Sequence, residues 1–418
     1  MHEQKAIIIT AIIAVLLLLI TALFVASVFR RTRQKGKYRR LDALRTFYGM
    51  KLVADLDAGG AFFPLDQYRA VPGSLDWQAV EEVLFLLIDE ELRRTGVMRL
   101  FTELGYVSFY EDLLESDNKV VKESAIDKLG RMANPASAPK LLPLLESADP
   151  DILSVTVRVL SKLGSKDGLR AVVEKLPRLL GQSLVARKAL ETDLLNFGSA
   201  AVPVLIDLLG EHADPAVISC VLETLSHFPP DTRSVFLAIE RLKDPDPDVR
   251  GKALRVLGRP EKNLPAHLPS LVLPLLSDPV WFVRLQAVKT AAALACEQGA
   301  APLGRLLIDQ NWQVRGEAAL TLARLGDCAL DVFLEALTMD DANARESVCE
   351  EIERAGFTRR LIENLVSSDT KVRTISQEIL KIMLGTGFSA PLVKYVKEGT
   401  DERAQGLLRQ ILAQGEAR

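Results

Sequence analysis

Two short stretches of the sequence place an aspartate, a tryptophan and an arginine at the same spacing. Residues 278–284 read Asp-Pro-Val-Trp-Phe-Val-Arg, and residues 309–315 read Asp-Gln-Asn-Trp-Gln-Val-Arg. Tryptophan and arginine are the residue types that most often anchor protein–protein interfaces. Trp281 and Trp312 are therefore candidates for a pair of partner-binding anchors. The alternative is that both cover the joint between neighbouring structural units, and largely buried indoles would rule out the anchor.

Residue patterns that carry catalysis or bind a metal are missing from the sequence. It contains neither a Gly-x-x-x-x-Gly-Lys-Ser/Thr phosphate loop nor a His-Glu-x-x-His zinc motif. The acidic pairs Asp340-Asp341 and Glu350-Glu351 could act as an acid–base couple, but we interpret them as solvated charges in a turn and on a helix face. The four histidines are interpreted as surface or boundary residues: His2, His212, His227 and His267. We expect no enzyme, no metal and no cofactor.

The four cysteines do not form a metal or disulfide pattern. They are Cys220, Cys296, Cys328 and Cys349, with no Cys-x-x-Cys pair among them. A zinc site needs closely spaced ligands, and a disulfide framework needs a denser set of cysteines. We therefore predict reduced, buried thiols.

The elements that must position the two tryptophans follow a repeat. One arginine marks the same position in each unit, and we call these residues the reference arginines: Arg250, Arg284, Arg315, Arg345, Arg373 and Arg403. Successive reference arginines are 34, 31, 30, 28 and 30 residues apart. A period of this length is typical of stacked helical repeats. In most units an apolar residue precedes the arginine and a small residue follows three positions later, as Val283 and Ala287 do around Arg284, which lets neighbouring helices approach closely.

Proline and aspartate mark the starts of the predicted helices. First helices open with Ala-Pro or Val-Pro, as at Pro139 and Pro203, because proline fits the first helical position. Second helices follow Asp-Pro turns, and we predict that aspartates such as Asp278 cap them. Residues 76–418 are thus predicted to form an all-α, right-handed α-solenoid of about ten helix pairs, beginning with helices at 76–94 and 97–104.

These motifs resemble HEAT repeats. Pro-Leu-x-x-Leu-Leu in the first helix and Asp-Pro-x-x-x-Val-Arg at the turn are similar to the bacterial HEAT repeats of phycobilin lyases, over about residues 105 to 418. The resemblance implies that the patterned aspartates and arginines tie adjacent repeats together. It also leaves an alternative function open: a lyase-like enzyme or small-ligand carrier that uses the concavity of the solenoid.

The N-terminal segment has the composition of a membrane span. Residues 6–29 carry no charge, and a helix of this length would reach roughly 36 Å, enough to cross a bilayer core. Seven cations follow directly: Arg30, Arg31, Arg33, Lys35, Lys37, Arg39 and Arg40. By the positive-inside rule they set topology, although such a cluster could also bind anionic lipid. We predict one transmembrane helix in residues 1–29 and a basic juxtamembrane collar at 30–75.

Charge and location together define the predicted function. Residues 41–418 hold 44 basic and 54 acidic side chains, a poor match for the phosphate backbone of a nucleic acid. We predict a single-pass protein of the plasma (inner) membrane with its N-terminus outside and its solenoid in the cytoplasm. Its expected role is a scaffold that recruits other proteins to a membrane complex, for example a cell-envelope glycan or signalling complex.

Overall fold

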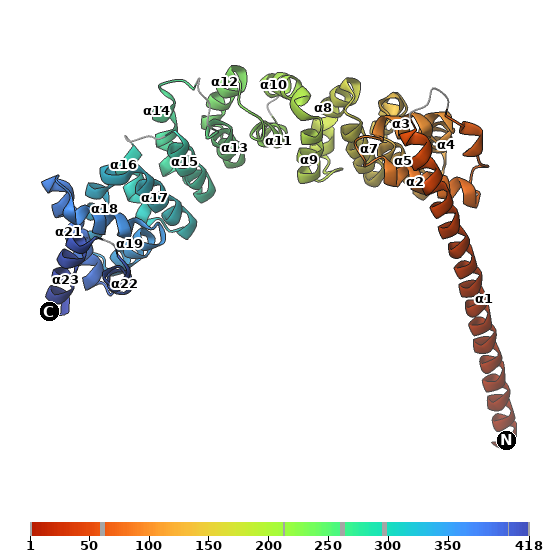
Figure 1. Cartoon of the computed structure of the whole chain (residues 1–418), viewed down its shortest axis with the longest axis horizontal. Helices are drawn as coiled ribbons and strands as arrows, with labels where there is room; N and C mark the ends of the chain where they lie inside the picture. The colour runs from red at the N-terminus through yellow and green to blue at the C-terminus, as the bar shows by residue number, and fades with distance from the viewer. Residues whose placement is uncertain are drawn as a thin grey trace. The chain divides into compact units, whose positions relative to one another are not determined.

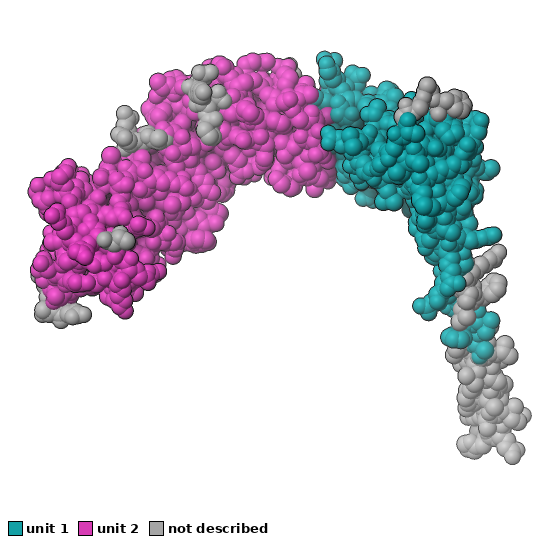
Figure 2. Space-filling view, viewed as in Figure 1, with its two compact units in different colours: residues 1–172 teal, residues 173–418 magenta. Residues whose placement is uncertain are grey.

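The computed structural model describes residues 2–58, 63–211, 214–259, 264–294, 299–399 and 401–416. For most of residues 2–33 it describes the backbone alone. Throughout the described ranges the regular structure is helical and contains no strand, which confirms the all-α prediction. The chain divides into two compact units, Met1–Val172 and Val173–Arg418 (Figure 2).

Unit 1 begins with one long helix. Its helices are α1 (His2–Asp57), α2 (Leu75–Leu87), α3 (Arg94–Glu103), α4 (Tyr106–Asp112), α5 (Lys119–Arg131), α6 (Ala138–Leu141) and α7 (Pro150–Leu163). Helix α8 (Lys166–Gly181) carries the chain from unit 1 into unit 2.

Unit 2 continues the same alternation of helices and short turns (Figure 1). Its helices are α9 (Arg187–Asn196), α10 (Ala201–Glu211), α11 (Pro215–Leu225), α12 (Thr232–Glu240), α13 (Pro247–Leu257), α14 (Leu268–Val272), α15 (Trp281–Ala293), α16 (Ala300–Arg305), α17 (Trp312–Leu325), α18 (Leu330–Leu337), α19 (Ala342–Arg354), α20 (Phe357–Glu363), α21 (Thr370–Gly385), α22 (Ala390–Glu398) and α23 (Glu402–Glu416). Counted over the described residues, the helices from α4 to α23 make ten consecutive pairs.

The second helices of successive pairs lie side by side in unit 2, because small and branched residues fill their contacts. Helices α11, α13, α15 and α17 form a continuous row. The predicted positions of closest approach are fully buried: Val249, Val283 and Val314 before the reference arginines, and Ala253, Ala287 and Ala318 after them. Burying each valine stabilises the fold by about 1.5–3 kcal/mol.

Some of the aspartates that the sequence predicts as helix caps have this role in the structure, and others do not. Asp149 and Asp214 accept backbone N–H bonds as the N-cap residues of α7 and α11, as predicted. The prediction was wrong for Asp278, because α15 starts at Trp281 with Val280 as its N-cap residue and no side-chain cap. Likewise α13 is capped by Asp246, the second of two consecutive Asp-Pro pairs.

The segment that follows the basic cluster packs more closely than predicted. Helix α1 continues without a break to Asp57, and its Leu41 and Leu52 are fully buried. Helix α2 packs along α1, so this stretch of α1 faces protein. Tyr68 is also buried, and its hydroxyl donates to Asp55 over 2.5 Å.

The helix predicted at 76–94 is wrong at its C-terminal end. Helix α2 stops at Leu87, and Leu92, which the predicted helix would have included, is fully exposed. The following turn is held by Arg93, whose Nε and Nη2 donate to Asp57 over 2.8 and 2.7 Å. This contact ties the turn after α2 to the C-terminal end of α1.

In the part of the chain whose side chains are described, no single helix is long and apolar enough to cross a membrane.

Candidate protein-binding surfaces

The repeating Asp and Arg residues join one helix pair to the next. Nε and Nη2 of Arg250 donate to the carboxylate of Asp278 over 2.8 and 3.0 Å. One repeat later, Arg284 donates in the same way to Asp309 over 2.7 and 2.8 Å. The side chains are at most 15% exposed, so water competes little for these two-pronged, charge-assisted bonds. Both arginines therefore tie adjacent repeats together. We call the two pairs, Arg250–Asp278 and Arg284–Asp309, the Arg–Asp clamps.

Each arginine also binds the turn before its own helix. Nη1 of Arg284 donates to the carbonyl oxygen of Asp278 over 2.9 Å, and Nη1 of Arg250 to that of Asp244 over 2.8 Å. The Asp278 carbonyl oxygen accepts from Arg284 of its own repeat, and its carboxylate accepts from Arg250 and from the backbone N–H of Val280. Burial pushes the pKa of Asp309 up, but the hydrogen bonds from Arg284 and from the backbone of Asn311 outweigh it, and the pKa is lowered.

This series of Arg–Asp clamps ends after Arg284 because the acceptor side chain changes. The acceptor stands six residues before the next reference arginine, where Met339 and Ser367 replace the aspartate. Arg315 still donates from Nη1 to the carbonyl oxygen of Asp309 over 2.9 Å. Its Nε is buried without a hydrogen-bond partner, and so is Nε of Arg345.

Trp281 and Trp312 stand at equivalent places on neighbouring helices. Each is the first residue of its helix, α15 or α17, and these helices pack side by side. The side chains are 41% and 63% exposed, so the burial that would have excluded a partner-binding role is not found. We call this pair the tryptophan ridge. Helix axes in contact lie about 8–10 Å apart, which sets the spacing of the two indoles.

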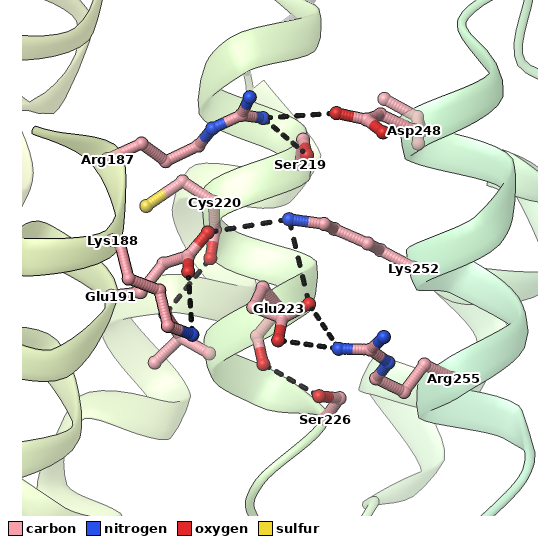
Figure 3. A network of polar contacts seen from close by, with 12 residues as sticks. Arg187, Lys188, Glu191, Ser219, Cys220, Glu223, Ser226, Asp248, Lys252 and Arg255 are labelled. Atoms are coloured by element: carbon pink, nitrogen blue, oxygen red, sulfur yellow. Dashed lines mark hydrogen bonds and ion pairs between the residues drawn. The ribbon is translucent and has the colours of Figure 1, made fainter. Parts of the chain in front are cut away.

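A second polar feature crosses α9, α11 and α13 (Figure 3). Glu191 of α9 and Glu223 of α11 are each only 5% exposed. Lys252 of α13 lies between them, with its Nζ 3.4 Å from Glu191 Oε1 and 3.6 Å from Glu223 Oε2. Arg255 donates from Nη1 to both oxygens of Glu223 over 2.6 and 2.8 Å. We call these four residues the charge network; its two glutamates are buried, whereas the Arg255 side chain is exposed.

This network fixes the register of three helices. A buried carboxylate that lost its cations would be strongly destabilised. Glu223 takes both of its cations from α13, whereas Glu191 pairs with Lys252 of α13 and with Lys188 of its own helix. Burial, chiefly, raises the pKa of the neighbouring Cys220 thiol to about 12, which keeps it protonated and unreactive. The network was missed in the sequence, although Glu191, Glu223 and Arg255 are spaced by 32 residues, close to the repeat period.

One acidic cluster has the shape of a cation site. Glu123, Asp149 and Asp151 place carboxylate oxygens close together. The ammonium of Lys119 already lies among them, 2.5 Å from Asp151, 2.9 Å from Asp149 and 3.7 Å from Glu123. Its hydrogen bonds to Asp151 and Asp149 raise the pKa of Lys119, so it stays charged. The protein thus supplies its own cation there.

Several side chains interpreted from sequence lie differently from expectation. Glu351 was taken as solvated but is 2% exposed, with Arg354 on its Oε1 and no partner on its Oε2. Asp341, of the other acidic pair, caps α19. Two of the cysteines are buried as predicted, Cys220 and Cys349, but Cys328 is exposed.

Some of the sequence predictions fall outside the described residues. These are His212, Cys296, most side chains of the predicted span at 6–29, and the side chains of His2, Arg30 and Arg33. The described cations of the basic cluster are all exposed: Arg31, Lys35, Lys37, Arg39 and Arg40. Their predicted part in topology or lipid binding is untested. His227 and His267 are exposed, as interpreted.

Comparison with known proteins identifies the repeats. The HEAT repeats family matches residues 108–180, 236–323 and 268–353. These segments are HEAT repeats. The matched segments include both Arg–Asp clamps and both members of the tryptophan ridge, so these features belong to the HEAT-repeat part of unit 2. No curated protein matches the sequence.

Several solved structures align with this chain at low sequence identity and with TM-scores below 0.5. An engineered protein is 21% identical with a TM-score of 0.37, over 74% of this chain and 96% of that one. The protein Kap121p is 13% identical with a TM-score of 0.45, over 89% of this chain and 47% of Kap121p. Kap121p bound to Pho4p gives 11% identity and a TM-score of 0.43, over 77% of this chain and 43% of that one. The chain spans about half the length of Kap121p.

Proposed function

We propose that this protein is a membrane-tethered scaffold whose HEAT repeats bind another protein through the tryptophan ridge. The observation that carries the proposal is the exposure of Trp281 and Trp312, 41% and 63%, at the same position of two adjacent helices. Exposed tryptophans are costly in water and supply large contact areas in interfaces. Two of them held at a fixed spacing suit a partner with two matching pockets.

The clamps favour binding over an enzymatic role for this surface. Trp281 stands three residues before Arg284, whose side chain bonds to Asp309 in the next repeat. The Arg284 side chain is therefore used in holding repeats together, while the Trp281 indole remains exposed. A preordered surface of this kind loses little conformational entropy when a partner binds.

The membrane part of the proposal is supported by the N-terminal sequence. Residues 6–29 are uncharged and seven cations follow within residues 30–40. Helix α1 is continuous from His2 to Asp57, so a span at 6–29 would pass directly into the part of α1 that packs on α2. We propose a single span in the plasma (inner) membrane, with the repeats in the cytoplasm.

A co-purification experiment with matched variants tests the scaffold. The full chain is solubilised from its native membranes in mild detergent, and co-purifying proteins are quantified for wild type and for the double variant Trp281→Ala/Trp312→Ala. The matched control is Phe236→Ala, which removes a side chain 61% exposed on α12 in the same unit. We expect at least one protein to be lost with the double variant and retained with the control.

The affinity of that protein then gives a quantitative test. Removing a tryptophan hot spot costs about 2 kcal/mol or more, so each single substitution should weaken binding roughly 30-fold. Circular dichroism should show unchanged helicity, since both indoles are exposed. Equal recovery of every co-purifying protein from wild type and the double variant would reject the tryptophan ridge as the binding surface.

The topology is tested separately with the exposed thiol. In intact cells that express a Cys296→Ser variant, a membrane-impermeant maleimide should label Cys328 only after permeabilisation. A truncation that lacks residues 1–29 should move from the membrane to the soluble fraction. Labelling of Cys328 in intact cells would contradict a cytoplasmic repeat domain.

A further inference from the structure

We propose that a cavity in unit 1, between α1, α2, α4 and α5, binds an acidic peptide segment whose carboxylate contacts Arg131. The cavity has a volume of about 650 Å³, within the range of sites that hold a few residues or a small ligand. It is separate from the tryptophan ridge, which lies in unit 2, and its argument does not depend on that ridge.

The walls of the cavity are largely aromatic and apolar. Trp77 and Phe85 of α2 are each 6% exposed, and Phe109 of α4 lies 5.4 Å from the Trp77 ring. Leu86 lines the same cavity but is 71% exposed. An open cavity with a rigid aromatic floor and an exposed leucine at its rim is suited to an apolar side chain from a partner.

Arg131 gives the cavity its anion preference. Its guanidinium lies 4.0 Å above the centroid of Phe85, which holds the planar group in one orientation. Among the described residues no carboxylate pairs with it. The other two cations of the lining are neutralised, since Arg45 pairs with Glu82 and Lys128 with Glu81. Arg131 is thus the one unbalanced charge among the described lining residues, and its N–H edges match a carboxylate.

Glu81 adds a second requirement for the ligand. This side chain is 4% exposed and lines the cavity. Its Oε2 accepts from Lys128 Nζ over 2.6 Å, but its Oε1 is buried without a hydrogen-bond partner. A buried carboxylate oxygen without a donor is unfavourable, so a ligand that supplied an N–H group would gain from meeting it.

A peptide supplies three groups, each of which would contact a different part of the cavity. An aspartate or glutamate side chain satisfies Arg131, a backbone N–H satisfies Glu81, and a neighbouring apolar side chain covers Leu86 and Phe109. A simple inorganic anion would provide only the first of these. The charge balance favours an acidic peptide over a basic one, because a cation would be repelled by Arg131 and find both glutamates already paired.

Fluorescence anisotropy with defined peptides tests the site. The full chain in detergent is titrated against fluorescein-labelled Gly-Glu-Leu-Phe-Gly with an amidated C-terminus, and against the same peptide with Gln in place of Glu. We expect the Glu peptide to bind at least tenfold more tightly than the Gln peptide, because it alone forms the charge-assisted pair. Raising the salt concentration should narrow this difference.

Variants decide whether the cavity is responsible. Arg131→Gln should remove the preference for the Glu peptide, and Leu86→Ser should weaken both peptides equally. Both side chains are exposed, so neither change should unfold the protein. Arg94→Gln removes the same charge from an exposed residue of unit 1 outside the cavity lining, and should change nothing. Equal binding of the two peptides to wild type, or an unchanged preference in Arg131→Gln, would overturn the proposal.

Discussion

Restoring the missing aspartate at Met339 should stabilise the repeats around Arg315. In the two preceding repeats the equivalent aspartate accepts two bonds from the arginine of the repeat before, over 2.7–3.0 Å. Arg315 has lost this acceptor, and its Nε is buried without one. Met339→Asp would supply the carboxylate at the position where Asp278 and Asp309 stand in their repeats.

The size of the expected stabilisation depends on which groups are already buried in the wild-type protein. Each charge-assisted hydrogen bond contributes about 1.5–3 kcal/mol, and the desolvation of the arginine is already incurred. Against this stand the desolvation of the new carboxylate and the loss of the half-buried methionine, which together offset much of the gain. We expect a net stabilisation of about 1–2 kcal/mol at neutral pH, disappearing as the pH falls below about 4 and the new carboxyl group is protonated.

Hydrogen exchange of backbone amides measures the change in stability helix by helix. A local measurement is needed because repeat arrays need not unfold in one step. Amides of α17 and α19 should be more protected in Met339→Asp than in wild type. Met339→Asn is the matched control, since it has the same shape without the charge, and should be neutral or destabilising. The reverse change, Asp309→Met, should destabilise by about 3 kcal/mol. Equal protection in Met339→Asp and Met339→Asn would refute the reasoning.

Three further predictions concern packing, pH and thiol reactivity. Gly304→Ala should destabilise the fold by about 1–3 kcal/mol in chemical denaturation, because the new methyl group would lie 2.2 Å from Val332 Cγ1. Gly406→Ala is the contrasting case, since the space around Gly406 is open, and it should stabilise α23 by about 0.5–1 kcal/mol. The pKa of Asp309 is lowered by folding. Its stabilising contribution is therefore present above the unfolded pKa of about 3.9 and is lost as the pH falls through the folded value. An Asp309→Asn variant should be less stable at pH 7 and show a flatter acid-denaturation profile. In the native Cys296→Ser protein, iodoacetamide followed by mass spectrometry should modify Cys328 alone, and modification of a buried cysteine without denaturant would contradict the described packing.

The repeating parts of the fold could be predicted because they depend on neighbours at a fixed distance along the chain. Val283 and Ala287 recur in register with their counterparts, and the structure buries them as expected. The resemblance to HEAT repeats implied that arginines such as Arg284 tie adjacent repeats together, and Arg284 does bond to Asp309 of the next repeat. The end of the clamp series was not predicted, although Met339 occupies the acceptor position in the sequence.

Features that depend on three-dimensional competition for a side chain could not be predicted. Asp278 has the position of a helix cap, but its carboxylate pairs with Arg250 of the preceding repeat, and the helix starts at Trp281 without a side-chain cap. Whether a tryptophan at a turn is covered depends on the neighbouring turn, which periodicity does not specify. Glu351 looked like part of a solvated pair, yet the helix turns it inward.

The clamps and the tryptophan ridge are linked by their positions. Trp281 and Trp312 each precede a reference arginine by three residues, and Arg284 and Asp309 bond the two repeats that carry the indoles. Loss of this pair would let α15 and α17 shift relative to one another and would alter the distance between the indoles. A ridge whose spacing is set before a partner arrives loses less entropy on binding than a pair of mobile side chains would. Asp309→Asn should consequently weaken partner binding even though Asp309 is buried, and a variant that loosens a repeat without touching this pair, such as Gly304→Ala, should not do so to the same extent.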